Sequence, residues 1–200
     1  GLAPELISEI VFEPEYRVSE ALRGLSDFSH IWLIWSFSEA RREGFSPTVR
    51  PPRLGGNERL GVFATRSPFR PNAIGLSSVK LEGISQTADG TVLHVSGADL
   101  MDGTPILDIK PYLSFTDSHP DATGGFAAEK LDYALKVECS KDLLDRIPPS
   151  KQSAMLALLA QDPRPSYQND DRIYGFDFGE FEIRFTVTDG VLTVMDIFKT

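Results

Sequence analysis

The chain has 200 residues, of which 41% are apolar, and this is enough to build a sizeable core in one domain or in one domain with a small appendage. Its single cysteine, Cys139, excludes an internal disulfide, and no apolar run approaches the roughly 18 residues that a membrane-spanning helix needs. We therefore expect a cytosolic protein, and the scattered histidines give no spacing that predicts a metal site.

The charges are distributed unevenly along the chain. A formal net charge of −9 argues against a polyanionic partner, because attraction to phosphate needs a local positive potential. Between residues 41 and 80, however, eight arginines and lysines stand against two glutamates, so this segment has a net charge of +6. The basic segment can hold an anion while the acidic remainder discourages nonspecific binding.

The first 120 residues read as short strands separated by turns. Residues 19–28 suit a short helical turn and a loop, and the aromatic and branched run at 29–38 predicts a buried strand. Further strands are predicted at residues 60–66, 76–85 and 91–97, with Asp89-Gly90 as the turn between the last two. This pattern predicts an antiparallel sheet or closed β-barrel, and the missing GxGxxG spacing argues against a nucleotide-binding βαβ unit.

The pattern changes after the turn-rich residues 118–125. A strand is predicted at residues 133–139, followed by a helix at 140–147 that is capped by Ser140 and a helix that is capped by Ser150 and ends before Pro163. Another strand is predicted at 172–179, and a hairpin with Asp189-Gly190 at its turn completes the chain. We therefore predict a mainly β protein with a β-barrel domain over residues 1–125 and a small α+β domain over 126–200.

Two loops, at residues 49–56 and 66–75, combine arginines with prolines. Each proline fixes φ, so the side chains between them lose little entropy when they are ordered around a ligand. A planar guanidinium donates hydrogen bonds to two oxygens of a phosphate or carboxylate at once. The loops therefore predict an anion site, although plain connecting loops are the alternative interpretation. The arginines concerned are Arg50, Arg53, Arg66 and Arg70.

A third segment carries an acid, an amine and a phenol. Asp108, Lys110 and Tyr112 follow a predicted turn at residues 102–105 with a spacing of two, so on a strand all three side chains lie on one side. Together they can bind a polar ligand or steer a proton. A local Asp–Lys pair on a solvated edge is the alternative.

Taken in order, the segments PTVRPPRLGGNERLGVFATRSPFRPNAIGLSSVKLEGI, DLMDGTPILDIKPYL and AQDPRPSY resemble the TrmO (YaeB-like) family of tRNA methyltransferases. The resemblance implies a small non-Rossmann β-barrel enzyme that uses S-adenosylmethionine to methylate N6 of threonylcarbamoyladenosine at position 37 of tRNA. It also implies a homodimer with its cofactor near the subunit boundary, and the tRNA anticodon loop as partner. A noncatalytic RNA-binding barrel and a small-molecule methyltransferase on the same fold remain alternatives.

Matched residue by residue, the resemblance implies cofactor contacts at Ser38 and Glu39, where many relatives carry His-Gln, and at Arg66, Leu76 and the segment Ala98, Asp99, Leu100, Met101 and Asp102. Asp108 and Tyr112 are candidate catalytic acceptors of the N6–H group. Candidate tRNA contacts are Arg50, Arg53, Arg70, Asn72, Lys110 and Arg164. The family also has an N-terminal strand and a Pro-Arg-Gln loop that touches the cofactor. The chain begins just after their place, and we expect a trimmed or disordered segment rather than a true absence.

Overall fold

The computed structural model describes residues 6–39, 44–51, 58–88, 90–130, 134–164 and 172–200. These residues form two compact units, one from residues 1–49 and 60–122 and the other from residues 50–59 and 123–200. Each unit is built around its own sheet, antiparallel in the first unit and mixed in the second, so the prediction of a mainly β fold is confirmed. None of the helices in the described ranges has the length and apolar character needed to cross a membrane.

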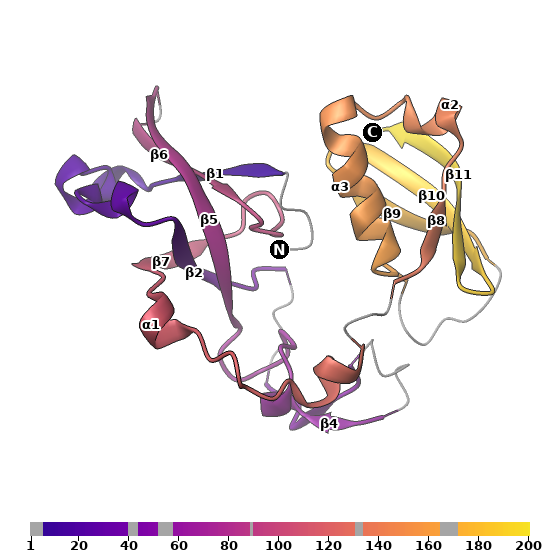
Figure 1. Cartoon of the computed structure of the whole chain (residues 1–200), viewed down its shortest axis with the longest axis horizontal. Coiled ribbons are helices and arrows are strands. Elements are labelled where there is room, and N and C mark those ends of the chain that lie inside the picture. Colours follow the sequence, from indigo (N-terminus) through magenta and orange to yellow (C-terminus); the bar gives the residue numbers. More distant parts are fainter. Residues whose placement is uncertain (1–5, 40–43, 52–57, 89, 131–133, 165–171) are drawn as a thin grey trace. The chain divides into compact units, whose positions relative to one another are not determined.

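The first unit contains a five-stranded sheet in the order β1-β6-β5-β2-β7, in which all neighbouring strands are antiparallel (Figure 1). Its strands are β1 (Ile7–Val11), β2 (His30–Ser36), β5 (Ile74–Thr87), β6 (Gly90–Ser96) and β7 (Ile106–Pro111). Within the described residues β1 and β7 are the two edges of this sheet and do not pair with each other. The sheet is therefore open where we predicted a closed barrel.

One face of this sheet carries the core of the first unit. Ile31 and Leu33 on β2 are fully buried and pack with Val79 on β5 and with Leu93 on β6. Because successive side chains of a strand point to opposite faces, the residues between them on β2 point away from this core. We call the opposite side of β5, β2 and β7 the outer face.

Short elements complete the first unit. They are the 3-10 helices η1 (Pro14–Tyr16), η2 (Ser19–Leu22), η3 (Leu25–Asp27) and η5 (Val62–Ala64), the strands β3 (Thr48–Val49) and β4 (Leu60–Gly61), and helix α1 (Ser114–Asp117). The strand predicted at residues 60–66 is wrong beyond Gly61. Both the amide and the hydroxyl of Thr65 donate to the Val62 carbonyl, and this closes a 3-10 turn there.

The second unit packs a helix on a four-stranded sheet in the order β8-β11-β10-β9 (Figure 1). Its elements are η6 (Gly125–Lys130), β8 (Lys136–Glu138), α2 (Lys141–Leu144), α3 (Pro149–Ala160), β9 (Tyr174–Phe178), β10 (Phe181–Thr188) and β11 (Val191–Lys199). Strand β8 pairs with β11 in parallel, whereas the other pairs are antiparallel.

Local chemistry sets the ends of several of these elements. Ser140 caps α2, as predicted, by accepting a hydrogen bond from the Leu143 amide at 3.4 Å. The Ser150 cap is wrong, because Pro149 begins α3 and a proline suits the first helical position, where no N–H is needed. Asp189 and Gly190 have φ values of 50° and 77°, which fits the tight turn predicted for the last hairpin.

Gly75 on β5 allows the Trp35 indole to lie flat against the strand. A Cβ atom added at Gly75 would overlap the indole ring, whose Nε1 donates to Ser77 Oγ at 3.0 Å. Overpacking of this kind costs about 1–3 kcal/mol. We expect Gly75→Ala to lower the free energy of unfolding by that amount in urea titrations.

Gly83→Ala on the same strand is the matched control for this prediction. A Cβ atom added at Gly83 meets nothing within 4 Å, and alanine loses less entropy than glycine in a strand. The control should therefore keep or slightly increase the free energy of unfolding. Equal stability of the two variants would contradict the proposed role of the glycine.

Candidate active site

Three rows of paired residues cross the outer face from β5 through β2 to β7. Directly paired residues of antiparallel strands point to the same side of a sheet. The rows are Lys80–His30–Tyr112, Ser78–Trp32–Lys110 and Leu76–Ile34–Asp108. The outer face therefore gathers four residues that the sequence marks as candidates: Leu76, Asp108, Lys110 and Tyr112.

Asp108 is held as a carboxylate. Lys110 Nζ lies 3.1 Å from Asp108 Oδ2, and the Ile109 amide donates to Asp108 Oδ1 at 2.8 Å. The lysine, followed by this amide, lowers the pKa of Asp108 below its ordinary value. A carboxylate of this kind accepts hydrogen bonds at neutral pH and cannot act there as a proton donor.

An aromatic group borders this carboxylate on the outer face. The Tyr112 ring lies 5.6 Å from the Trp32 ring and 6.2 Å from the His30 ring, measured between centroids. Asp117 Oδ2 accepts from the Leu113 amide at 2.9 Å and from Trp32 Nε1 at 2.8 Å. These two donors lower the pKa of Asp117, so its carboxylate fixes the Trp32 indole next to the tyrosine.

The end of β2 brings three separate segments together. The Ser36 amide donates to the Pro105 carbonyl at 3.0 Å, and the Phe37 amide donates to the Ala73 carbonyl at 2.9 Å. Because β5 and β7 both run antiparallel to β2, the segments that precede them meet the residues that follow β2. The basic loop before β5 and the turn before β7 therefore both lie beside Ser38.

The basic loop before β5 is stiffened by its own hydrogen bonds. Thr65 Oγ1 accepts from the Ser67 amide at 3.2 Å, and Ser67 Oγ accepts from the Phe69 amide at 3.3 Å. One N–H group of the Arg70 guanidinium donates to the Thr65 carbonyl at 3.1 Å. The prolines and these contacts together leave the loop little freedom to lose when a ligand binds.

A cavity of about 570 Å³, which we call the strand-end cavity, lies between this loop and the end of β2. Its size falls within the range of about 300–1,000 Å³ that is typical of small-molecule sites. It is lined by Ser36, Gly44, Phe45, Pro68, Phe69, Arg70, Pro71, Asn72, Ala73 and Ile74. Two predicted substrate contacts, Arg70 and Asn72, therefore lie in its wall.

The residues of the implied cofactor site lie in different settings, and none of them is among the residues that line this cavity. Arg66 and Glu39 are exposed, Ser38 is half-buried, and Leu76 on the outer face is 54% exposed. Ala98 is only 5% exposed and belongs to the core on the other face, against which Leu100 also packs. Asp99, Met101 and Asp102 are exposed, next to a turn in which the Thr104 amide donates to the Met101 carbonyl.

The remaining candidate tRNA contacts also differ in their settings. Arg50 is exposed and belongs to the second unit, whereas Arg53 lies outside the described residues. The Arg164 side chain is only 10% exposed and forms two hydrogen bonds of 2.8 Å with the Asp162 carboxylate. This internal pair does not favour the predicted contact of Arg164 with tRNA.

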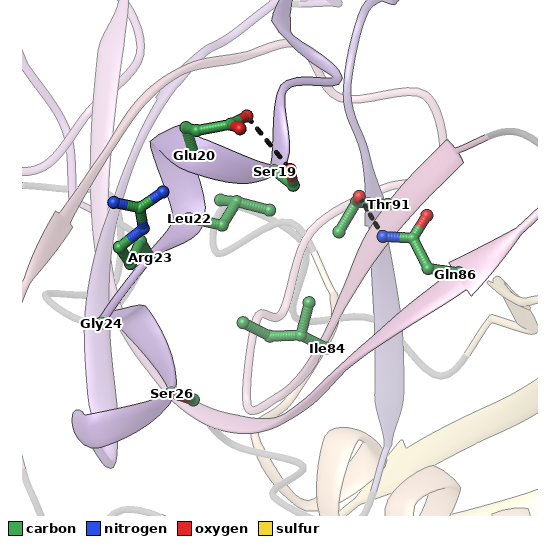
Figure 2. A pocket seen from close by; sticks show the side chains of 9 residues that line it. All are labelled: Ser19, Glu20, Leu22, Arg23, Gly24, Ser26, Ile84, Gln86 and Thr91. Atoms are coloured by element: carbon green, nitrogen blue, oxygen red, sulfur yellow. Dashed lines mark hydrogen bonds between the residues drawn. The ribbon is translucent and has the colours of Figure 1, made fainter.

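A second cavity, of about 380 Å³, lies at the other end of β5 (Figure 2). Ile84 and Leu22 form its apolar wall, and Gln86 donates to Thr91 Oγ1 across one side. Arg23 and Glu20 bring opposite charges to its lining, and no aromatic ring is among its nine lining residues. The strand-end cavity has both aromatic rings and predicted site residues, so it is the better candidate for the site. The described residues contain no cluster of three or more potential metal-ligating side chains.

Comparisons with known proteins show which family the chain resembles along most of its length. The family tRNA-methyltransferase O N-terminal domain matches residues 1–118, and the TrmO C-terminal domain matches residues 132–200. The tRNA (adenine(37)-N6)-methyltransferase of Escherichia coli strain K12 is 41% identical over 198 residues, which cover 94% of this chain and 84% of that protein. A Pseudomonas aeruginosa protein described as an S-adenosylmethionine-dependent methyltransferase is 40% identical over 193 residues, which cover 92% of this chain and 81% of that protein.

A crystal structure of TrmO from Pseudomonas aeruginosa gives a TM-score of 0.75 at 35% identity, and the match covers 100% of this chain and 86% of that one. These similarities place the chain in the class of tRNA methyltransferases. Within that class it belongs to the tRNA-methyltransferase O (TrmO) family, which confirms the resemblance found in the sequence.

The pair formed by Lys110 and Asp108 generates a prediction about titration. Lys110 is the larger cause of the lowered pKa of Asp108, so Lys110→Met should raise this pKa toward its ordinary value. Lys80→Met is the control, because Lys80 pairs with Glu82 on the same sheet at 2.9 Å. Carboxyl carbon NMR titrations should show the Asp108 pKa rise in the first variant and stay constant in the second. An unchanged Asp108 pKa in Lys110→Met would contradict the assigned cause.

Proposed function

We propose that this chain transfers the methyl group of S-adenosylmethionine to N6 of adenosine 37 in tRNA, and that this nitrogen already carries a threonylcarbamoyl group. The observation that carries the proposal is the family match over residues 1–118 and 132–200. The predictions of an enzyme and of S-adenosylmethionine as its cofactor are confirmed by the relatives described above. Threonylcarbamoyladenosine as the substrate rests on the resemblance of the sequence motifs.

The residues of the implied cofactor site have the chemistry that this cofactor needs. The exposed Arg66 guanidinium can hold the carboxylate of its amino acid end, and the exposed Leu76 side chain can cover its adenine. Asp99 and Asp102 are both exposed and can accept hydrogen bonds from ribose hydroxyls. S-adenosylmethionine supplies an electrophilic methyl group on a sulfonium sulfur.

The reaction is an in-line displacement in which the N6–carbon bond forms while the carbon–sulfur bond breaks. The main contribution of the protein is to hold nitrogen, carbon and sulfur in line, with the nitrogen about 3 Å from the methyl group. The N6–H proton must also leave. We assign Asp108 as its acceptor, because Lys110 and the Ile109 amide keep this side chain a carboxylate. Tyr112, in the next row but one, is the second candidate.

We expect basic side chains to bind the anionic groups of the tRNA substrate. We assign Arg50, Arg53, Arg70 and Lys110 to anticodon-loop phosphates or to the threonyl carboxylate. Arg70 supports this assignment most directly, because it lines the strand-end cavity from a stiffened loop. Residues 1–125 then form the methyltransferase domain and residues 126–200 a C-terminal domain that adds tRNA contacts.

A homodimer in the cytoplasm is the form in which we expect the enzyme to work. Ala98 packs in the core on one face of the sheet, whereas Leu76 lies on the outer face. A single copy therefore does not surround one ligand with both of these implied cofactor contacts. Segment 98–102 of a second copy, placed against the outer face, would complete the cofactor site.

The proposed reaction is tested by mass spectrometry of nucleosides from tRNA that has been incubated with the protein and labelled S-adenosylmethionine. We expect label in N6-methyl-threonylcarbamoyladenosine and none with tRNA that lacks the threonylcarbamoyl group. Label in unmodified adenosine 37 would contradict threonylcarbamoyladenosine as the substrate but would support methyl transfer to N6 as the reaction. RNA binding without any transfer of label would favour a noncatalytic RNA-binding protein.

A charge substitution tests the assigned cofactor site. Arg66→Ala should weaken S-adenosylmethionine binding about tenfold in isothermal titration, because it removes a charged hydrogen-bond partner of the carboxylate. The fold should be spared, since Arg66 is an exposed loop residue. Arg23→Ala is the matched control: Arg23 is also exposed but lines the other cavity. Equal cofactor affinity in both variants would refute the role of Arg66.

A further inference from the structure

We propose that the strand-end cavity holds the target adenine itself, with Phe45 against the face of the ring and Asn72 at its N7 atom. The inference rests on the proposed tRNA substrate and names the residues that select the base. Neither side chain belongs to the implied cofactor contacts. The cavity is therefore available for the second reactant, the tRNA base.

The lining of the cavity matches a flat ring with apolar faces and polar edges. Phe45, Pro68, Phe69, Pro71, Ala73 and Ile74 supply the apolar walls, whereas Arg70 and Asn72 supply polar groups. An enzyme that modifies a base must take the base out of its stack and into a pocket that reads its edge. An anticodon-loop base is single-stranded and can be splayed out in this way.

Asn72 has the side chain that suits the edge of adenine. Adenine presents an N7 acceptor there, and the NH2 group of an asparagine carboxamide can donate to it. This contact leaves the single N6–H of the modified base for the Asp108 carboxylate. The Ile74 amide donates to the Asn72 carbonyl at 2.8 Å, which fixes the backbone from which the carboxamide projects. Since this contact lies in the plane of the base, the lone pair above N6 stays open to the methyl group.

Phe45 is a large apolar side chain that remains 52% exposed while it lines this cavity. A base that stacks on the Phe45 ring shields this ring from water. Such stacking depends little on which base is bound. Phe45 therefore supplies affinity, whereas Asn72 supplies the choice of a purine. One guanidinium N–H group of Arg70 is used by the Thr65 carbonyl, which leaves others for the phosphate of the same nucleotide.

The position of the cavity brings such a base next to the proposed reaction site. Ile74 lines the cavity and Leu76 lies two residues further along β5 on the same side, a separation of about 7 Å. Ser36 on β2 likewise lies two residues from Ile34, which pairs with Asp108. The row that contains the implied cofactor contact Leu76 and the proposed proton acceptor therefore borders the cavity.

The experiment measures binding of two anticodon stem-loop RNAs that carry either adenosine or 7-deazaadenosine, which lacks the N7 acceptor, at position 37. The wild-type protein should prefer adenosine about tenfold, and Asn72→Ala should abolish this preference. Phe45→Ala should weaken binding of both RNAs about tenfold and keep the preference. Phe115→Ala is the control, because Phe115 is 85% exposed and lines neither cavity.

The inference is overturned if Asn72→Ala keeps the wild-type preference, if the wild type has none, or if Phe45→Ala binds RNA as Phe115→Ala does. Isothermal titration with S-adenosylmethionine is run on each variant and should give the wild-type affinity. A loss of cofactor affinity in Phe45→Ala and Asn72→Ala would assign the cavity to the cofactor, which also overturns the inference. These experiments measure binding and need no turnover. If the protein transferred no methyl group, the proposed function would fail, but the binding results would still support or overturn the inference about the cavity.

Discussion

The antiparallel pairing of β2 with both β5 and β7 is the constraint on which the rest of the structure depends. It places the end of β2 beside the beginnings of its two neighbours, where the Ser36 and Phe37 amides bind the Pro105 and Ala73 carbonyls. Segments that are far apart in the sequence therefore meet at one edge of the sheet. The same pairing sets Leu76 and Asp108 on either side of Ile34, so the strand that closes the core on one face also organises the candidate site on the other.

Several carboxylates of this acidic protein are stabilised by hydrogen-bond donors close to them. Three carboxylates of the first unit have nearby donors: Asp108 has Lys110 and the Ile109 amide, Glu82 has Ser96 and Lys80, and Asp117 on α1 has the Leu113 amide and Trp32. Each set of donors lowers the pKa of its carboxyl group. These groups therefore stay ionised across the neutral range, and the outer face presents hydrogen-bond acceptors whose charge does not change with modest shifts of pH.

Much of this organisation follows from local sequence signals. The aromatic and branched residues of the run at 29–38 predict β2, the spacing of two predicts the shared face of Asp108, Lys110 and Tyr112, and Asp189-Gly190 predicts the final turn. Residue type, period and turn chemistry are all properties of neighbouring residues. Contacts between distant residues escape such signals. Asp117 meets Trp32 across 85 positions, and nothing near either residue indicates it. The open edges of the sheet and the burial of Ala98 escape for the same reason: each is decided by packing against residues elsewhere in the chain.

Both tryptophans of the chain, Trp32 and Trp35, lie on β2, on opposite faces of the same sheet. The second compact unit contains no tryptophan. Intrinsic indole emission is therefore a built-in optical probe of one half of the molecule alone. Trp32 is anchored by the Asp117 carboxylate on the outer face, and Trp35 by the Ser77 hydroxyl over Gly75. Quenching by added solutes therefore distinguishes events at the outer face from loosening of the interior.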